Sequence, residues 1–230
     1  MVRSIEQLVA EQVAKWTAAR SGPKVERKET WPTITVSREF GSRGAAIGEA
    51  VAEALGFTYW DQELVHAVAE ETGVKEQLLE SLDEHAWGTI DEIISTFLLH
   101  TGGVKDYVRE LAEVIHTIDN HGEAVVLGRG GQFLIDSGRA LRVRIVSPFE
   151  KRVEDYAESK ELSQKEAEKQ VKEKEEDRQQ FYNKYFKEDV SESSHYDLVL
   201  NSGVFSLDQS RELISTAYKT KFGKLPHVSG

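Results

Sequence analysis

Arginine, serine and glycine gather in one short stretch of this 230-residue chain, and together they suit the binding of phosphate. The stretch runs from Ser37 to Gly44 and reads SREFGSRG. Arg38 and Arg43 supply fixed positive charge in a planar fork that fits two phosphate oxygens at once. The glycines at positions 41 and 44 allow a tight turn that brings backbone N–H groups close to an anion. We therefore expect a phosphate-binding loop.

Apolar residues on both sides predict the strand and the helix that must position this loop. The β-branched run Thr33 to Val36 predicts a buried strand, and residues 45–55 predict a helix. Four apolar side chains fall on one face of that helix: Ile47, Val51, Ala54 and Leu55. Because free N–H groups and the positive end of the helix dipole point into such a turn, it can bind an anion. The spacing matches neither standard nucleotide-binding glycine motif, so an ordinary turn whose glycines only allow close packing stays open.

A second glycine-rich turn follows another predicted strand. Residues 123–127 predict the strand, and Gly128-Arg129-Gly130-Gly131 follows it. Ligands of open α/β sheets bind in the crevice outside the carboxyl ends of the strands. Arg129 is therefore a candidate phosphate ligand, although it could instead cap a helix or pair with an acid.

The remaining pattern alternates strands with helices and predicts an α/β fold. Further strands are expected at residues 57–60, 141–146 and 196–201. Helices are expected at residues 4–20, 62–72, 75–83, 86–100, 104–120, 149–158, 163–187 and 207–222, with Gly73 ending the second. This order predicts three α/β/α layers around a parallel sheet of about five strands. We expect residues 1–30 to form an amphipathic helix and linker that pack outside the domain or against a partner, and residues 31–230 to form one domain.

Charge and composition narrow the classes of partner. A net charge of −11 argues against general nucleic-acid binding, so a phosphate site must gather its arginines locally. Seven are candidates: those at positions 38, 43, 129, 142, 144, 152 and 178. Among them, Arg142 and Arg144 share a strand face, and Arg152 is expected to be a solvated helix residue.

The same composition bears on location and assembly. The chain has no cysteine, which excludes disulfides and zinc–thiolate sites and fits a cytoplasmic protein. No apolar run approaches the about 20 residues that a membrane span needs, so no membrane partner is expected. No signal peptide is read at the N-terminus. Assembly into a homo-oligomer through the N-terminal helix is one expectation.

The run GSRGAAIGEAVAEALGFTYWD resembles the first strand–helix unit of cytidylate kinases, and more closely cytidylate kinase-like proteins whose lysine-free loop begins S-R-E. The segments VVLGRGGQFL, LRVRIVSPFEKRV and YDLVLNSGVFSLDQSRELI resemble later parts of these kinases. Within the resemblance, Gly44 replaces the family lysine, and Ala46 replaces the threonine that helps to hold magnesium. Gly130 replaces the aspartate of the G-R-D turn. The likeness covers roughly residues 33–222.

This resemblance implies a P-loop kinase fold with a helical substrate-binding insert (61–121) and a lid-like segment (159–187). It implies transfer of the γ-phosphoryl group from ATP, with Mg²⁺, to a nucleoside monophosphate, CMP or dCMP above all. The loop residues that would cradle the donor phosphates are Gly41, Ser42, Arg43, Gly44, Ala45 and Ala46. Arg43, slightly favoured, or Arg38 would replace the lysine, and Arg178 would close over the transferred group. Arg129 and Asp61 would hold the acceptor, and Ser42 and Asp61 would bind magnesium.

Three alternatives stay open from the residues. The insert could only cover the sheet rather than bind substrate. The changes at Gly44, Ala46 and Gly130 remove a cation, a hydroxyl and a carboxylate, which favours a nucleotide-binding or regulatory protein that has lost catalysis. The chain could also be an interaction module that acts through its N-terminal helix.

Overall fold

The computed structural model describes residues 7, 9–14, 31–70, 72–80, 82, 84–100, 106–223 and 225. Five parallel strands in this part form a sheet in the order β2-β3-β1-β4-β5. They are β1 (Thr33–Arg38), β2 (Thr58–Trp60), β3 (Ala124–Leu127), β4 (Ala140–Val146) and β5 (Leu198–Asn201). β1 lies at the centre, and Ile34 pairs with Val125 of β3 and Leu141 of β4. The predicted parallel α/β sheet is confirmed.

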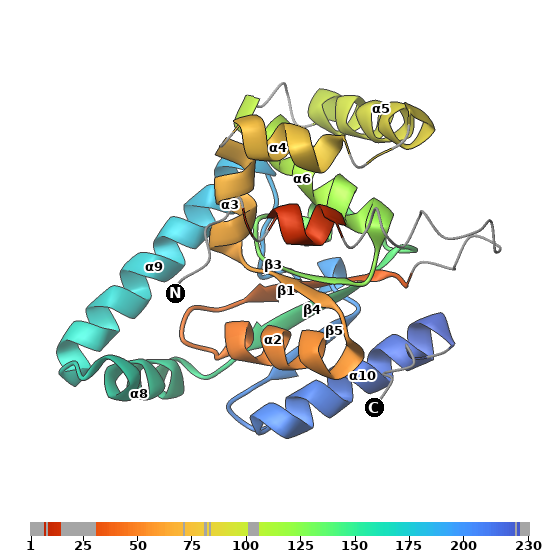
Figure 1. Ribbon diagram of the computed structural model, residues 1–230. Helices are drawn as coiled ribbons and strands as arrows, with labels where there is room; N and C mark the ends of the chain where they lie inside the picture. The colour runs from red at the N-terminus through yellow and green to blue at the C-terminus, as the bar shows by residue number, and fades with distance from the viewer. Residues whose placement is uncertain are drawn as a thin grey trace.

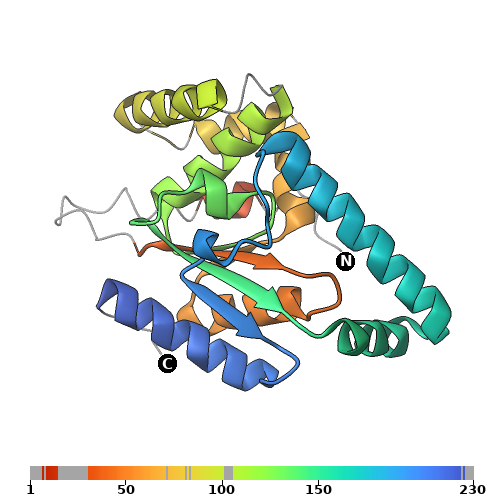
Figure 2. The same ribbon diagram turned by 180° about the vertical axis from the view of Figure 1, so that it is seen from behind.

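Helices cover both faces of the sheet and extend beyond one end of its strands (Figure 1). These helices are α2 (Gly44–Leu55), α3 (Gln62–Glu70), α4 (Thr72–Leu79), α5 (Glu84–His100), α6 (Asp106–His121), α7 (Gly131–Leu134), α8 (Phe149–Lys160), α9 (Gln164–Tyr185) and α10 (Leu207–Phe222). Helices α2 and α10 lie on one face, α6 lies on the other beneath α4 and α5, and α8 and α9 lie beyond one end of the strands (Figure 1). The long helix α9 runs from α8 back to the helical insert, as both views show (Figure 2).

Two hydrophobic clusters form because successive strand residues point to opposite faces of the sheet. Ile34 and Val36 of β1 pack with Ile47 and Val51 of α2 and with α10. On the other face, β2 and β3 pack with apolar side chains of α3 and α6. Burial on both faces is typical of parallel strands and makes the sheet a firm support for the loops at its carboxyl edge.

One local expectation was wrong, and one short helix was not predicted. Gly73 does not end the helix before it; α3 ends at Glu70, and Gly73 lies inside α4. Glycine costs a helix only about 1 kcal/mol relative to alanine, which tertiary packing outweighs. The short helix α7 carried no periodicity and was not predicted.

The N-terminal segment also differs from the expectation. Residues 9–14 are helical, and Val9 is buried in the cluster that contains α6, although this helix was expected to pack outside the domain or against a partner. The rest of the helix expected at 4–20, and most of its linker, lie outside the described residues. No described helix has the length and apolar character needed to cross a membrane.

Candidate functional site

The loop between β1 and α2 lies at the carboxyl end of the central strand, where the sequence predicted it. Gly41 and Arg43 both have left-handed backbone conformations, with φ of 82° and 57°. A Cβ on Gly41 would lie 2.9 Å from the carbonyl oxygen of Arg152, so the close approach of two backbones requires glycine here. Ser42 Oγ donates a hydrogen bond of 2.8 Å to the Glu39 carbonyl oxygen and so helps to hold the turn.

The side chain of Arg38 extends from this loop toward the second glycine-rich turn. A Cβ on Gly128 would collide with Arg38 Nη1, so glycine at that position makes room for the guanidinium. Arg178 Nη1 of α9 donates a hydrogen bond of 2.8 Å to the Arg38 carbonyl oxygen. Burial, together with the positive charges of Arg178 and Arg129, lowers the pKa of Arg38 to about 10. The structure therefore brings together Arg38, Arg129 and Arg178, three of the predicted site residues.

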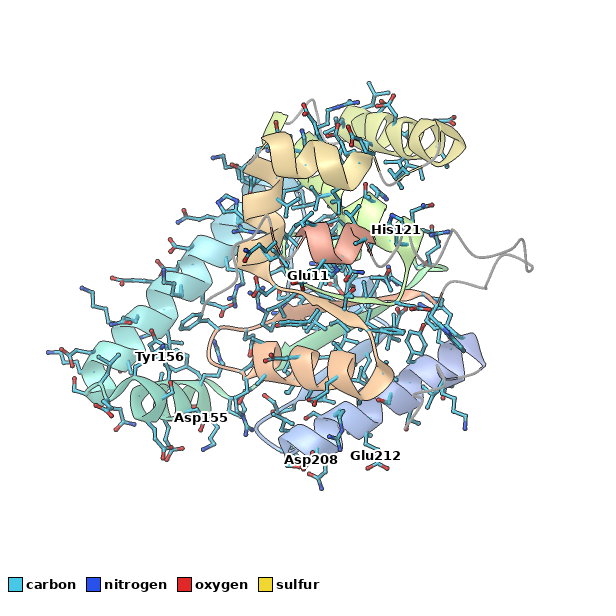
Figure 3. All side chains as sticks on the ribbon, viewed as in Figure 1. Glu11, His121, Asp155, Tyr156, Asp208 and Glu212 are labelled. Carbon is cyan, nitrogen blue, oxygen red and sulfur yellow. The ribbon has the colours of Figure 1, made fainter. Side chains whose placement is uncertain are left out.

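Arg43 is turned away from these three arginines. Its Nη2 donates to the Ser202 carbonyl oxygen, and its Nε lies 3.6 Å from Asp155 Oδ2 on α8, which is labelled in Figure 3. The Arg43 side chain is 43% exposed. The residue also occupies the N-cap position of α2, with no side-chain hydrogen bond to the helix.

Helix α9 returns to the loop and supplies both a cation and aromatic surface. The guanidinium of Arg178 lies 5.8 Å from the centre of the Phe40 ring, and that of Arg129 lies 5.5 Å from the ring of Phe181. Burial lowers the pKa of Arg178, and Glu175 opposes that change. Such cation–aromatic contacts help to hold both guanidinium groups in place.

Residues 33–204 match the family described as the Cytidylate kinase-like family. The chain belongs to the cytidylate kinase-like family. Its structure is similar to that of an uncharacterized protein from Eubacterium ventriosum ATCC 27560, with 20% identity and a TM-score of 0.67 over 83% of this chain and 99% of that one. A shikimate kinase from Bacteroides thetaiotaomicron is more distant, with 13% identity and a TM-score of 0.45 over 80% and 97% of the two chains. Curated proteins gave no match.

The family match confirms the predicted membership and the P-loop kinase-like α/β/α fold. The glycine at position 130, where cytidylate kinases carry aspartate, has a structural reason in this family member. A Cβ on Gly130 would collide with the ring of Phe186, the C-cap residue of α9, which packs against this turn. An aspartate could not be accommodated there without moving Phe186.

Sequence reasoning missed Arg152, which was expected to be solvated. Its side chain is buried, and it donates to the carbonyl oxygens of Ser147 at 3.0 Å and Phe40 at 3.1 Å. Its Nη1 lies 3.2 Å from Glu175 Oε2, and that carboxylate oxygen also accepts the Phe40 N–H at 2.8 Å. Helical spacing could have revealed this, because Arg152 shares the apolar face of α8 with Phe149, Val153 and Tyr156.

Asp61 and Ser42, the two predicted magnesium ligands, both make hydrogen bonds to the backbone of the protein. Asp61 Oδ1 accepts the Leu64 N–H at 2.7 Å at the start of α3, and the buried Ser42 Oγ bonds the loop backbone. Ala46 offers no hydroxyl. Within the described residues, no three or more His, Cys, Asp or Glu side chains form a group that could hold a metal ion. Magnesium usually keeps substrate phosphates and water as ligands, so these residues suit an ion carried by a nucleotide better than an ion held by the protein.

Proposed function

We propose that the chain transfers the γ-phosphoryl group of ATP to a nucleoside monophosphate, with CMP or dCMP as the expected acceptor. The observation that carries this proposal is the convergence of Arg38, Arg129 and Arg178 at the carboxyl ends of β1 and β3. Phosphoryl transfer needs positioning and charge neutralisation more than covalent chemistry from the protein. Guanidinium groups fixed beside two glycine-rich turns supply both.

Each cation has a role in this proposal. The backbone of residues 41–46 cradles the donor phosphates, Arg129 holds the acceptor phosphate, and Arg178 closes over the transferred group. Arg38 takes the place of the missing lysine, because its guanidinium extends toward Gly128 whereas Arg43 bonds Ser202 and faces Asp155. This choice reverses the slight preference for Arg43 that the sequence alone suggested. MgATP enters as the substrate, with its ion held by the phosphates.

A nucleotide-binding protein without catalysis is the second candidate, and one contact favours it. The Phe40 N–H of the loop already donates to a carboxylate of the chain itself, that of Glu175. Ala46 in addition lacks the hydroxyl through which related kinases hold magnesium. A cytoplasmic location and the absence of nucleic-acid partners stay predictions from the sequence.

Turnover with a panel of monophosphates tests the proposal. Wild type, Arg38→Ala and Arg43→Ala are assayed with MgATP and CMP, dCMP, UMP or AMP. Loss of one preorganised cation should reduce the rate about 100-fold or more in Arg38→Ala. Arg43→Ala, the matched control, should change it only a few-fold, because that side chain bonds groups outside the arginine cluster.

The other outcomes separate the candidates. Wild type that binds ATP but turns over no monophosphate would replace the kinase by the binding protein. A large loss in Arg43→Ala alone would return the lysine's role to Arg43.

A further inference from the structure

Arg144 is a buried cation that the roles above do not use. It lies on β4, two residues before the end of the strand, and pairs in register with Ser37 of β1. Only 4% of the residue is exposed. Arg144 therefore lies near the carboxyl ends of the strands, which is where Arg38 and Arg129 also lie.

The bonding partners of Arg144 are neutral. Its Nη1 donates a hydrogen bond of 3.2 Å to Ser37 Oγ, and its guanidinium lies 5.6 Å from the centre of the Tyr196 ring. No carboxylate of the described residues forms an ion pair with Arg144. The exposed Asp189 is the nearest approach to one, since the charge of Arg144 makes a small contribution to the lowered pKa of that carboxyl. Removing a cation from water without a counter-charge costs stability, so structural pairing does not explain this residue.

Arg142, on the same face of the same strand, shows the contrast. Its Nη2 lies 3.2 Å from Asp197 Oδ1, and Asp197 also pairs with Lys221. Strand geometry is the same for both arginines, and only Arg142 has a structural counter-ion.

The surroundings of Arg144 place it on the acceptor side of the sheet. Tyr196 Oη lies 3.2 Å from Ser37 Oγ and 3.5 Å from Gln132 Nε2 of α7, the short helix that follows the Arg129 turn. Arg144 also contributes to the lowered pKa of Arg178. Among the described residues, the buried side-chain atoms without a hydrogen-bond partner belong to Thr35, His195 and Ser210, not to Arg144. The guanidinium nitrogens of Arg144 that do not bond Ser37 therefore keep a small contact with solvent.

We propose that Arg144 is a further anion-binding residue, which contacts the phosphate group of the acceptor from the floor of the site. A bound phosphate would supply the negative charge that the protein does not. The identity of the acceptor as a nucleoside monophosphate rests on the proposed function, whereas the affinity of Arg144 for phosphate does not.

Binding and stability measured together test this role. Isothermal titration of CMP, ATP and inorganic phosphate into wild type, Arg144→Met and Arg142→Met gives the affinities. Arg144→Met should bind CMP and phosphate about 10-fold or more weakly, the loss of one charge-assisted hydrogen bond, and ATP with a smaller change. Arg142→Met should bind all three like wild type. Without ligand, Arg144→Met should melt at or above the wild-type temperature, because the substitution removes an unpaired buried charge.

Each other result decides a separate point. Unchanged affinity in Arg144→Met, or an equal loss in Arg142→Met, would overturn the inference. It would fall too if Arg144→Met and Arg144→Gln both failed to fold, since that marks a structural residue. Phosphate binding that weakens in Arg144→Met, without CMP binding to wild type, would keep the inference and reject the acceptor. Wild type that binds neither would reject both.

Discussion

Gly44 and Arg38 compete for one place in the loop. A Cβ on Gly44 would lie 2.5 Å from Arg38 Cβ and 3.0 Å from Arg38 Cγ, so any side chain at position 44 must displace Arg38. The lysine that cytidylate kinases carry at this position and the arginine of the S-R-E motif therefore exclude each other. On the proposed function, the chain has exchanged one cation for another rather than lost one.

This exclusion predicts how restoring the lysine will behave. Gly44→Lys alone should destabilise the fold by about 1–3 kcal/mol, as overpacking usually does, and should lower turnover of MgATP and CMP. Arg38→Gly combined with Gly44→Lys should recover stability and part of the rate. Ala45→Lys, which adds the same side chain at the next, exposed position, is the control. A Gly44→Lys protein as stable and as active as wild type would contradict the argument.

At the scale of elements, Arg152 joins the loop, the β4–α8 turn and α9. Its Nε lies 3.5 Å from Glu39 Oε2, and its Nη1 lies 3.2 Å from Glu175 Oε2. Glu39 Oε2 also accepts the Ser147 N–H at 2.9 Å, which ties the loop to the end of β4. The glutamate of the S-R-E motif thus positions the loop through Arg152.

Arg152→Ala should lower the free energy of unfolding by roughly 2–4 kcal/mol. The value lies toward the low end for a broken buried pair, because both carboxylates keep some contact with solvent. Urea denaturation measures it through the midpoint. Lys151→Ala on the same helix removes only pairs at the surface, with the exposed Glu154 and the half-buried Asp155, and should leave the midpoint nearly unchanged. Equal midpoints for Arg152→Ala and wild type would show that the three elements are held without it.

The sequence predicted the elements better than the contacts between them. The β-branched strands and the first loop were readable because their signals are local, in the pattern of residues 33–55. The bonding partners of Arg43 and Arg152 were not readable, because Asp155, Ser202 and Glu175 come from more than 100 residues away or from a different helix. The choice between Arg43 and Arg38 as the substitute cation was not readable either, because the sequence does not show that Arg38 fills the space beside Gly44.

For the molecule as a whole, charge is distributed unevenly. The chain carries a net charge of −11, yet the positive charge of Arg178 lies close enough to Arg38, Arg144 and Arg152 to interact with each of them. A protein with this distribution attracts anions locally while repelling polyanions such as nucleic acids at longer range. This distribution supports the proposed preference for small phosphorylated ligands over nucleic acids.

The free energy of unfolding should depend on pH through His116 of α6, a residue outside the arginine cluster. The side chain is buried, and burial lowers the pKa of His116 from 6.5 to about 4, although Asp119 opposes that change. Between these values the unfolded chain binds a proton that the folded chain does not, so the free energy of unfolding falls as pH falls from about 6.5 toward 4. Each pH unit in this window is worth roughly 1.4 kcal/mol, which gives about 2 kcal/mol between pH 6.5 and pH 5.

His116→Gln should lack this loss. Urea denaturation of both proteins at pH 7.5, 6 and 5 measures it, with pH 7.5 correcting for any direct effect of the substitution. Parallel losses in the two proteins would show that carboxyl groups, rather than His116, set the acid sensitivity of the fold.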